Sequence, residues 1–374
     1  MSYVLGSDEW TLVLDELAPT VHFQFAATCR TFRDVVSSNT ATSSALGGCH
    51  NENPQRVQGS VTKKQHVFGH SLALAKWARN NGCPVDNCCE FAAAAGCLDI
   101  LKWAHKNGCK LYTNTPVRAA EHGHLEVLRW LHANACPWDG EGTCATAASG
   151  GQLEVLKWLR AIGCRGGGVT CNAAAASGHL DVLKWAHVHE CPFDSITFAC
   201  AARRGKMQVM QWLRVNGCPW DERVFRYAAM GGQIEALQWL RANGCPWDEF
   251  TGTEAARCGQ LEAIQWLHAN GCPWNECTCN KAAEYGQLEV LKWAHNNGCP
   301  WNEWTCALAA KYGRLEMLKW MHANGCPWDE LTCEWAEGYH QLRVLKWARA
   351  NGCPSYNDSD DDSDESDMAS DEDA

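Results

Sequence analysis

The chain has 374 residues, including 24 cysteines and 20 tryptophans, and its formal net charge at pH 7 is -11. It contains no apolar run of about 18 residues, as a membrane-spanning helix would need, and its first residues lack the basic and apolar regions of a secretory signal. We therefore expect an intracellular protein, cytoplasmic or nuclear, in which the cysteines are reduced.

The first segment with a helical pattern is residues 8–38. Its apolar side chains have the spacing of three short helices, and Pro19 separates the first helix from the second. Helices this short are marginal alone, so the segment is expected to pack against a partner or against the rest of the chain.

This segment resembles an F-box, whose core has an apolar helix ending in Leu-x-Pro, followed by a Cys-Arg-x-Phe-Arg motif. The opening Leu-Pro pair of that family is absent. An F-box would dock to the Skp-type adaptor of a cullin–RING ubiquitin ligase. The alternative is a helical cap on the open end of the repeats that follow. The adaptor-binding residues that the resemblance implies are Trp10, which replaces the opening pair, and Leu14, Leu17, Pro19, Cys29 and Phe32.

Residues 39–65 are polar and rich in Ser, Thr and Gly, which predicts a linker or a degenerate repeat. From residue 66 to residue 354 the chain then repeats about every 27 residues. Such a period is typical of a solenoid, in which each unit buries its apolar face against its neighbours. One Trp marks each unit, at Trp77, Trp103, Trp130, Trp158, Trp185, Trp212, Trp239, Trp266, Trp293, Trp320 and Trp347.

The unit that starts at Thr305 illustrates the predicted structure. Thr305 is a candidate N-cap, and an Ala-rich helix follows it as far as the turn at Gly313. A second helix is expected from about Arg314 to Ala323, with an apolar face at three-residue spacing. One loop departs from the other units: residues 164–168 contain three consecutive glycines, and this predicts a weak point in the array.

The units resemble the ankyrin repeat. The stretch from Thr115 to Leu128 is close to the family pattern T-P-L-H-x-A-A-x-x-G-H-L, and Gly313 and Gly325 match its two glycines. The units here are shorter than the family norm of about 33 residues, and the missing residues fall where that family has a β-hairpin. We expect an all-α, ankyrin-like helical solenoid of ten to eleven short repeats, with little or no strand and a protein-binding function.

Binding should use positions that the repeat does not fix. In ankyrin-like stacks these lie beside the Ala-Ala pair of the first helix, on the concave side. Arg and aromatic side chains are favoured in binding hot spots, although about half of these positions should be ordinary solvated surface. The candidates are Arg118, Glu121, Arg203, Arg204, Tyr227, Glu254, Arg257, Lys281, Glu284, Tyr285, Lys311, Tyr312, Trp335 and Tyr339.

The remaining cysteines and tryptophans are predicted to be structural. Repeat cysteines lie too far apart to share a zinc ion, so they should be small core residues, as should the helix tryptophans. No nucleophile with a base departs from the repeat, so neither an enzyme nor a cofactor is expected. The loop tryptophans should pack between neighbouring units, and they are Trp138, Trp220, Trp247, Trp274, Trp301 and Trp328.

The negative charge is concentrated in the acidic tail, residues 355–374, which carries ten acidic side chains and no Lys or Arg. This composition predicts disorder. Ser359 and Ser370 each precede three acidic residues, which suits an acidophilic kinase, although a solubilising role explains the tail equally well. The rest of the chain is nearly neutral, so a nucleic-acid partner is not expected.

Two functions are consistent with these patterns. In the first, the chain is a monomeric substrate receptor that links a protein target on the solenoid to a ubiquitin ligase through residues 8–38. In the second, it is an ankyrin-type scaffold or inhibitor without a ligase, and residues 8–38 cap the solenoid.

Overall fold

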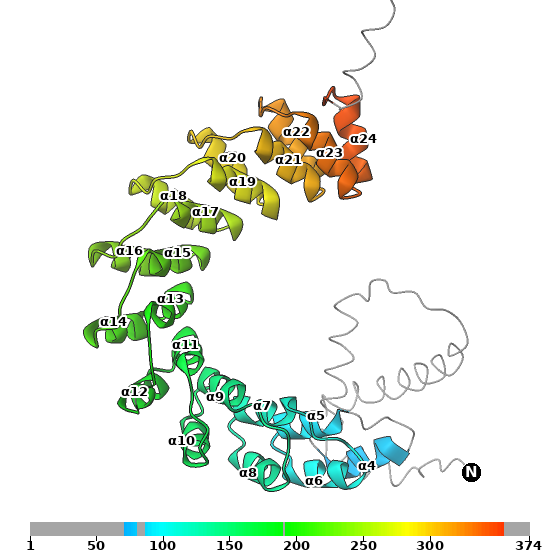
Figure 1. The fold of residues 1–374 in the computed structure, drawn as a ribbon, viewed down its shortest axis with the longest axis vertical. Helices are drawn as coiled ribbons and strands as arrows, with labels where there is room; N and C mark the ends of the chain where they lie inside the picture. Colours follow the sequence, from blue (N-terminus) through cyan, green and yellow to red (C-terminus); the bar gives the residue numbers. More distant parts are fainter. Residues whose placement is uncertain (1–70, 81–86, 190, 355–374) are drawn as a thin grey trace, which may run out of the picture. The chain divides into compact units, whose positions relative to one another are not determined.

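The computed structural model describes residues 71–80, 87–189 and 191–354, and it shows an all-α solenoid of paired short helices with no strand among those residues (Figure 1). The F-box-like segment, the linker and the acidic tail lie outside the described residues. The solenoid divides into two compact units, residues 1–163 and 164–374, and the division falls at the start of the glycine-rich loop.

Each repeat contributes a first helix and a second helix. In unit 1 the first helices are α5 (Cys88–Ala94), α7 (Asn114–Glu121) and α9 (Gly140–Ser149). The second helices are α4 (Leu72–Asn80), α6 (Leu98–Lys106), α8 (Leu125–Ala133) and α10 (Leu153–Ala161). The α4 helix is the first helix of the described residues in chain order, and it has the place of a second helix.

Unit 2 continues the same pattern. Its first helices are α11 (Gly168–Ser177), α13 (Ser195–Arg203), α15 (Glu222–Met230), α17 (Phe250–Arg257), α19 (Glu276–Tyr285), α21 (Glu303–Lys311) and α23 (Glu330–Gly338). Its second helices are α12 (Leu180–Val188), α14 (Met207–Val215), α16 (Ile234–Ala242), α18 (Leu261–Ala269), α20 (Leu288–Asn296), α22 (Leu315–Ala323) and α24 (Leu342–Ala350).

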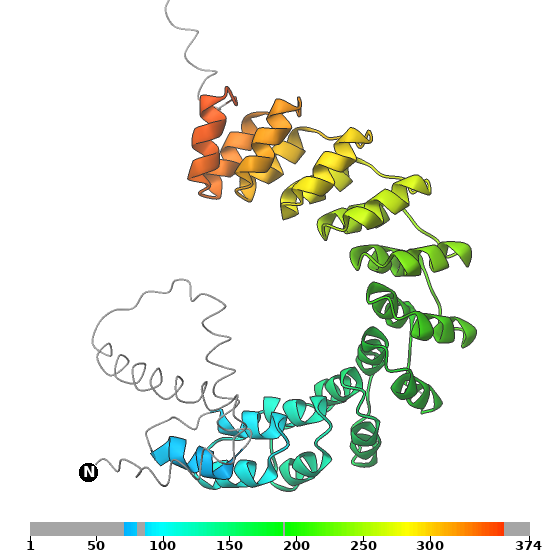
Figure 2. The same cartoon turned by 180° about the vertical axis from the view of Figure 1, so that it is seen from behind.

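Within unit 2 the first helices pack closely side by side, whereas the second helices fan apart (Figures 1 and 2). The close packing has a simple cause in the sequence: each first helix carries small buried residues, such as Ala309 and Ala310, that allow neighbouring backbones to approach. The first helices therefore form one continuous layer in this unit, and their outward side chains form one continuous face.

Thr305 is not the N-cap that the sequence predicted. The α21 helix begins two residues earlier, and Asn302 caps it. The Thr305 hydroxyl accepts the Asn302 N–H at 3.2 Å and donates to Asn280 Oδ1 of the previous repeat at 2.6 Å. Asn and Asp are preferred over Thr at the N-cap position. Thr305 is buried and joins two repeats instead.

The predicted core is confirmed for the cysteines and corrected for the tryptophans. The repeat-closing cysteines are buried from Cys109 to Cys353, with the exception of the half-buried Cys164. The helix tryptophans from Trp103 to Trp347 are only half-buried. In the Thr305 unit the buried second-helix residues are Met317, Leu318 and Met321. The tryptophans lie beside this buried face, where they contact the loops between repeats.

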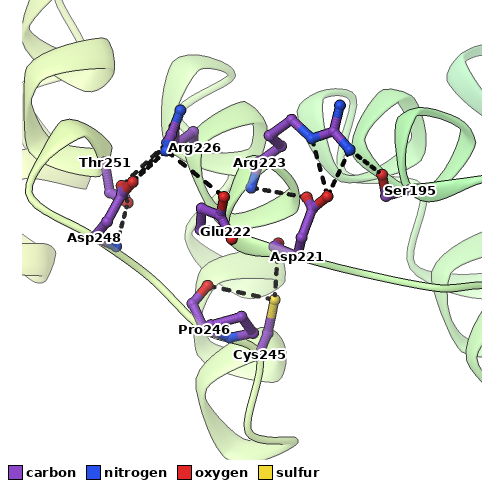
Figure 3. Close-up of polar contacts among 9 residues, drawn as sticks. All are labelled: Ser195, Asp221, Glu222, Arg223, Arg226, Cys245, Pro246, Asp248 and Thr251. Carbon is purple, nitrogen blue, oxygen red and sulfur yellow. Dashed lines mark hydrogen bonds and ion pairs between the residues drawn. The ribbon is translucent and has the colours of Figure 1, made fainter.

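The closing cysteines also connect the two ends of a repeat. Cys245 Sγ donates to the carbonyl oxygen of Asp221, the residue that caps the first helix of the same repeat, at 3.7 Å (Figure 3). The same contact recurs at Cys218, Cys272, Cys299, Cys326 and Cys353. A thiol is only a weak donor, so these contacts orient the chain more than they stabilise it.

Charged side chains link the first helices at their N-terminal ends (Figure 3). Arg223 of α15 donates to Ser195 of α13 at 2.8 Å and to its own cap, Asp221. Arg226 of α15 makes a forked contact with Asp248 in the loop before α17, with Nε 3.0 Å from Oδ2. Both contacts run between neighbouring repeats and therefore fix how the first helices stack.

Candidate protein-binding surface

The outward face of the last four first helices carries a continuous strip of aromatic and charged side chains, which we call the aromatic–cationic strip. Its members come from α17, α19, α21 and α23 and from the residue that ends each of the last three. They are Glu254, Arg257, Lys281, Glu284, Tyr285, Trp304, Lys311, Tyr312, Trp335 and Tyr339.

Lys311 is surrounded by three aromatic rings. Its Nζ lies 4.6 Å from the ring centroid of Tyr339, 5.1 Å from that of Trp335 and 5.4 Å from that of Tyr312. These are cation–π distances. Contact with the Tyr339 side chain, its largest influence, raises the pKa of the Lys311 ammonium above the ordinary lysine value. Lys311 is therefore a fixed positive charge on an aromatic surface.

The strip continues toward α19 through Glu284. The Tyr312 hydroxyl donates to Glu284 Oε1 at 3.5 Å, and Lys281 Nζ donates to Glu284 Oε2 at 2.7 Å. The bond to Glu284 raises the pKa of Lys281. Lys281 also lies 6.0 Å from the ring centroid of Tyr285. One carboxylate thus holds a tyrosine and a lysine from two successive repeats.

Arg257 of α17 closes the other end of the strip. Its Nε donates to Glu254 Oε2 at 2.8 Å, and this bond raises the pKa of the guanidinium. The guanidinium carbon lies 5.5 Å from the ring centroid of Tyr285 in the next repeat. Arg257 and Lys311 therefore each face an aromatic ring contributed by the following repeat.

The charges of the strip are not all balanced within it. Arg257 and Lys281 each have a carboxylate partner, Glu254 and Glu284 respectively. Among the described residues no carboxylate forms an ion pair with Lys311. Four rings beside these charges are exposed on more than two fifths of their surface: Tyr285, Trp304, Tyr312 and Tyr339.

The repeats that build this surface match a known family. A family model described as ankyrin repeats, many copies, matches residues 117–160 and 279–322. The chain is an ankyrin repeat protein. Among solved structures, the ankyrin repeat domain of human ASB11 is similar at 18% identity, over 42% of this chain and 84% of that chain, with a TM-score of 0.35. No curated protein sequence matches significantly.

Nine of the fourteen candidate binding residues of this ankyrin repeat protein lie together in the strip, and five lie elsewhere. Arg203 and Arg204 are exposed at the end of α13, and Tyr227 is half-buried on α15. Arg118 belongs to unit 1, where it forms an ion pair with Glu121 at 3.4 Å. The predicted adaptor-binding residues, from Trp10 to Phe32, lie outside the described residues.

Trp304 is a member of the strip that the sequence analysis did not identify. Its ring centroid lies 5.3 Å from that of Trp335 in a T-shaped arrangement, and 46% of the residue is exposed. The available signal was its position, since Trp304 is the only tryptophan of its repeat outside the helix and loop positions that carry tryptophan periodically. An off-period aromatic residue next to the Thr-Cys pair lies on the outward face of the first helix.

Among the described residues, no cluster of three or more His, Cys, Asp or Glu side chains is placed to hold a metal ion. None of the described helices has the length and apolar character that a membrane span requires.

Proposed function

We propose that this ankyrin repeat protein is a non-enzymatic binding module that captures a protein partner on the aromatic–cationic strip. The observation that carries the proposal is the Lys311 ammonium, which lies among three aromatic rings and forms no ion pair with a carboxylate of the described residues. Trp, Tyr and Arg are enriched among interface hot spots, and aromatic rings bury a large area at little cost in side-chain entropy.

The chemistry of the strip indicates the kind of segment it would bind. A partner carboxylate can reach Lys311, whereas Arg257 and Lys281 are already paired. Apolar side chains on either side of that carboxylate would cover Tyr312 and Tyr339, which are exposed. A protein segment with an acidic residue between apolar residues therefore fits the strip better than a uniformly charged one.

The partner surface is tested by comparing what the full chain and a Lys311→Glu, Tyr339→Ala variant retain from a cell extract, quantified by mass spectrometry. A specific partner should fall at least about tenfold on the variant, as loss of a hot spot of about 1.4 kcal/mol or more predicts. A Lys184→Glu, Val188→Ala variant on α12 is the matched control and should retain it. Equal retention by all three proteins would remove the strip from the interface.

We propose further that residues 8–38 dock a Skp-type adaptor, which would make the chain a substrate receptor of a cullin–RING ubiquitin ligase. The support is the F-box-like pattern of Leu14, Leu17, Pro19, Cys29 and Phe32. The test is a pull-down of the full chain with the adaptor, beside Leu17→Asp and Phe32→Asp variants that keep the wild-type circular dichroism. Binding that both variants abolish supports the ligase link, and no binding by the wild type favours a scaffold or inhibitor.

A further inference from the structure

A groove of about 590 Å³ crosses the turns of the last three repeats, beside the aromatic–cationic strip. It lies at the turns that connect each first helix to its second helix, and these turns directly follow Tyr312 and Tyr339 in the chain. Its floor is apolar and includes Leu288, Leu315 and Leu342. Leu342 is 63% exposed, more than any other leucine among the described residues, so this floor is open to a ligand.

The groove carries uncompensated positive charge. Arg314 and Arg343 both line it, both are exposed, and no described carboxylate forms an ion pair with either. The one carboxylate in its lining, Glu316, is held by Lys319 at 2.8 Å. The α22 and α24 helices, of nine residues each, also start in the groove and add the partial positive charge of their first turns.

Arg314 is a departure from the repeat. The residue after the turn is glutamine in most repeats of unit 2, at Gln233, Gln260, Gln287 and Gln341. The Arg314 side chain lies across the turn of the preceding repeat, because a Cβ on Gly286 would meet its Nε at 2.9 Å. The packing of two neighbouring turns therefore holds the positive charge of Arg314 over the groove. The repeat does not require a charge at this position, since other repeats have glutamine there.

The chain contains a complementary segment within reach. The described part ends at Pro354, and the acidic tail follows directly. To return to the start of α24 the tail must span about 14 Å, the length of nine helical residues. Asp360 follows Pro354 by six residues, which reach about 20 Å when extended. Residues 360–362 can therefore reach Arg343, and Asp364 and Glu365 can reach Arg314 about one helix spacing, or roughly 10 Å, further on.

We infer that the acidic tail of this chain occupies the groove and that Arg314 and Arg343 hold it there. Single exposed ion pairs are weak, but a tethered segment has an effective concentration on the order of millimolar, so several weak contacts suffice. The tail would then lie at the edge of the aromatic–cationic strip. Phosphorylation at Ser359, which precedes three acidic residues, would add charge to the part that faces Arg343 and tighten the contact.

The inference can be tested with zero-length carbodiimide cross-linking of the full chain. An Arg314→Lys, Arg343→Lys variant keeps the charge of the groove and supplies the amines that the reagent requires. We expect linkage between these amines and carboxylates of residues 358–367, mapped by mass spectrometry, in the monomeric product. The yield should fall at least about fivefold in 1 M NaCl, where charges are screened beyond about 3 Å.

A matched variant distinguishes occupancy of the groove from simple tethering. Arg349→Lys places an amine in the last turn of α24, closer to the start of the tail and outside the groove lining. If tethering alone brought the groups together, this amine would link as well as those in the groove, and that result would overturn the inference. Absence of any linkage in the groove would also overturn it and would leave the groove to an external acidic partner.

Linkage between copies is tested with an equimolar mixture of ¹⁵N-labelled and unlabelled chain. Cross-linked peptides that join a labelled to an unlabelled chain, in the proportion that random pairing of copies gives, would show that the tail binds a second molecule, and this would overturn the intramolecular assignment. The experiment needs no partner protein, so a failure of the proposed partner surface would leave its result unchanged.

Discussion

The imidazole of His295 lies on the indole of Trp301, with ring centroids 3.6 Å apart and planes 15° from parallel. Both rings also meet Trp320 of the next repeat, at 5.8 Å and 5.9 Å. We call this cluster of one histidine, one loop tryptophan and one helix tryptophan the brace. It recurs at His268, Trp274 and Trp293, and at His322, Trp328 and Trp347. Arginine replaces the histidine at Arg214 and Arg241, where it lies over the loop ring.

The brace predicts that the loop tryptophans stabilise the stack. Trp301→Ala removes both ring contacts and leaves a gap between two repeats, so it should lower the free energy of unfolding by about 2 kcal/mol. Chemical denaturation followed by far-ultraviolet circular dichroism measures this loss. Trp304→Ala is the matched control, because Trp304 is nearly half exposed and should cost less than about 1 kcal/mol. Equal losses would show that the brace contributes nothing beyond burial of one indole.

The turn before α24 contains a strained residue. His340 has φ +58°, whereas the equivalent turn residue one repeat earlier is Gly313, with φ +70°. A left-handed conformation costs a residue with a Cβ about 1 kcal/mol. His340→Gly should therefore slow amide hydrogen exchange in α23 and α24, by roughly fivefold if the full 1 kcal/mol is recovered. Hydrogen-exchange mass spectrometry checks this.

The reverse substitution, from glycine to a residue with a Cβ, can be made at Gly313. A Cβ on Gly313 would lie 2.4 Å from Gln341 Oε1, so Gly313→Ala combines backbone strain with a steric clash. It should accelerate exchange in α21 to α24. If His340→Gly accelerated exchange as well, the strain at His340 would have to be offset by contacts of its imidazole.

A histidine in unit 1 predicts a dependence of stability on pH. His124 Nε2 lies 3.0 Å from the carbonyl oxygen of Ala94 in the previous repeat. Burial is the main cause that lowers the pKa of His124, and His122 lowers it further. The unfolded chain therefore takes up a proton at this site more readily than the folded chain. Stability is then lost as the pH falls through about 6.5, the unfolded value, toward the lower folded value.

His124→Gln tests this dependence, because glutamine occupies the equivalent position at Gln152. The midpoint of thermal unfolding, measured by circular dichroism at pH 7.5 and at pH 5.5, should differ less for the variant than for the wild type. If the two proteins lost the same stability between these pH values, other histidines would account for the whole effect.

Much of the fold could be predicted because the same helix and turn signals recur in each repeat. The turn glycines and the Ala-Ala pair place both helices of every unit, and α22 begins and ends within one residue of its predicted bounds. The cap was predicted wrongly because Thr305 and Asn302 are both capping residues, and sequence alone does not show which one reaches the free amides. The helix tryptophans were placed in the core because their spacing matches the apolar face, whereas they lie at its edge.

The candidate surface was predictable only in part. The repeat fixes which positions flank the Ala-Ala pair, so Arg257, Lys281 and Lys311 could be named. Their contacts could not be predicted, since Lys311 meets Tyr339 of another repeat and this depends on how neighbouring helices are offset. The histidines of the brace were missed as well. Their signal was present, because a histidine or arginine follows the helix tryptophan by two residues in every unit.

The buried cysteines predict a thiol reactivity that reports on unfolding. Burial is the main cause that raises the pKa of Cys245 and Cys272 from 9.0 to about 12. At pH 8.5 this lowers their thiolate fraction by about two to three orders of magnitude, and only the thiolate reacts. Cys258, in the repeat of Cys272, and Cys277, in the repeat that follows, are only half-buried and serve as internal references. Cys258 and Cys277 should be alkylated by iodoacetamide in the native chain, whereas Cys245 and Cys272 should react only as urea opens their repeats.

Peptide mass spectrometry across a urea series measures the alkylation of each of these cysteines. Reaction of Cys245 at the rate of Cys277 without urea would mean that the repeat opens in the native state, because a closed repeat gives the reagent no access to this thiol.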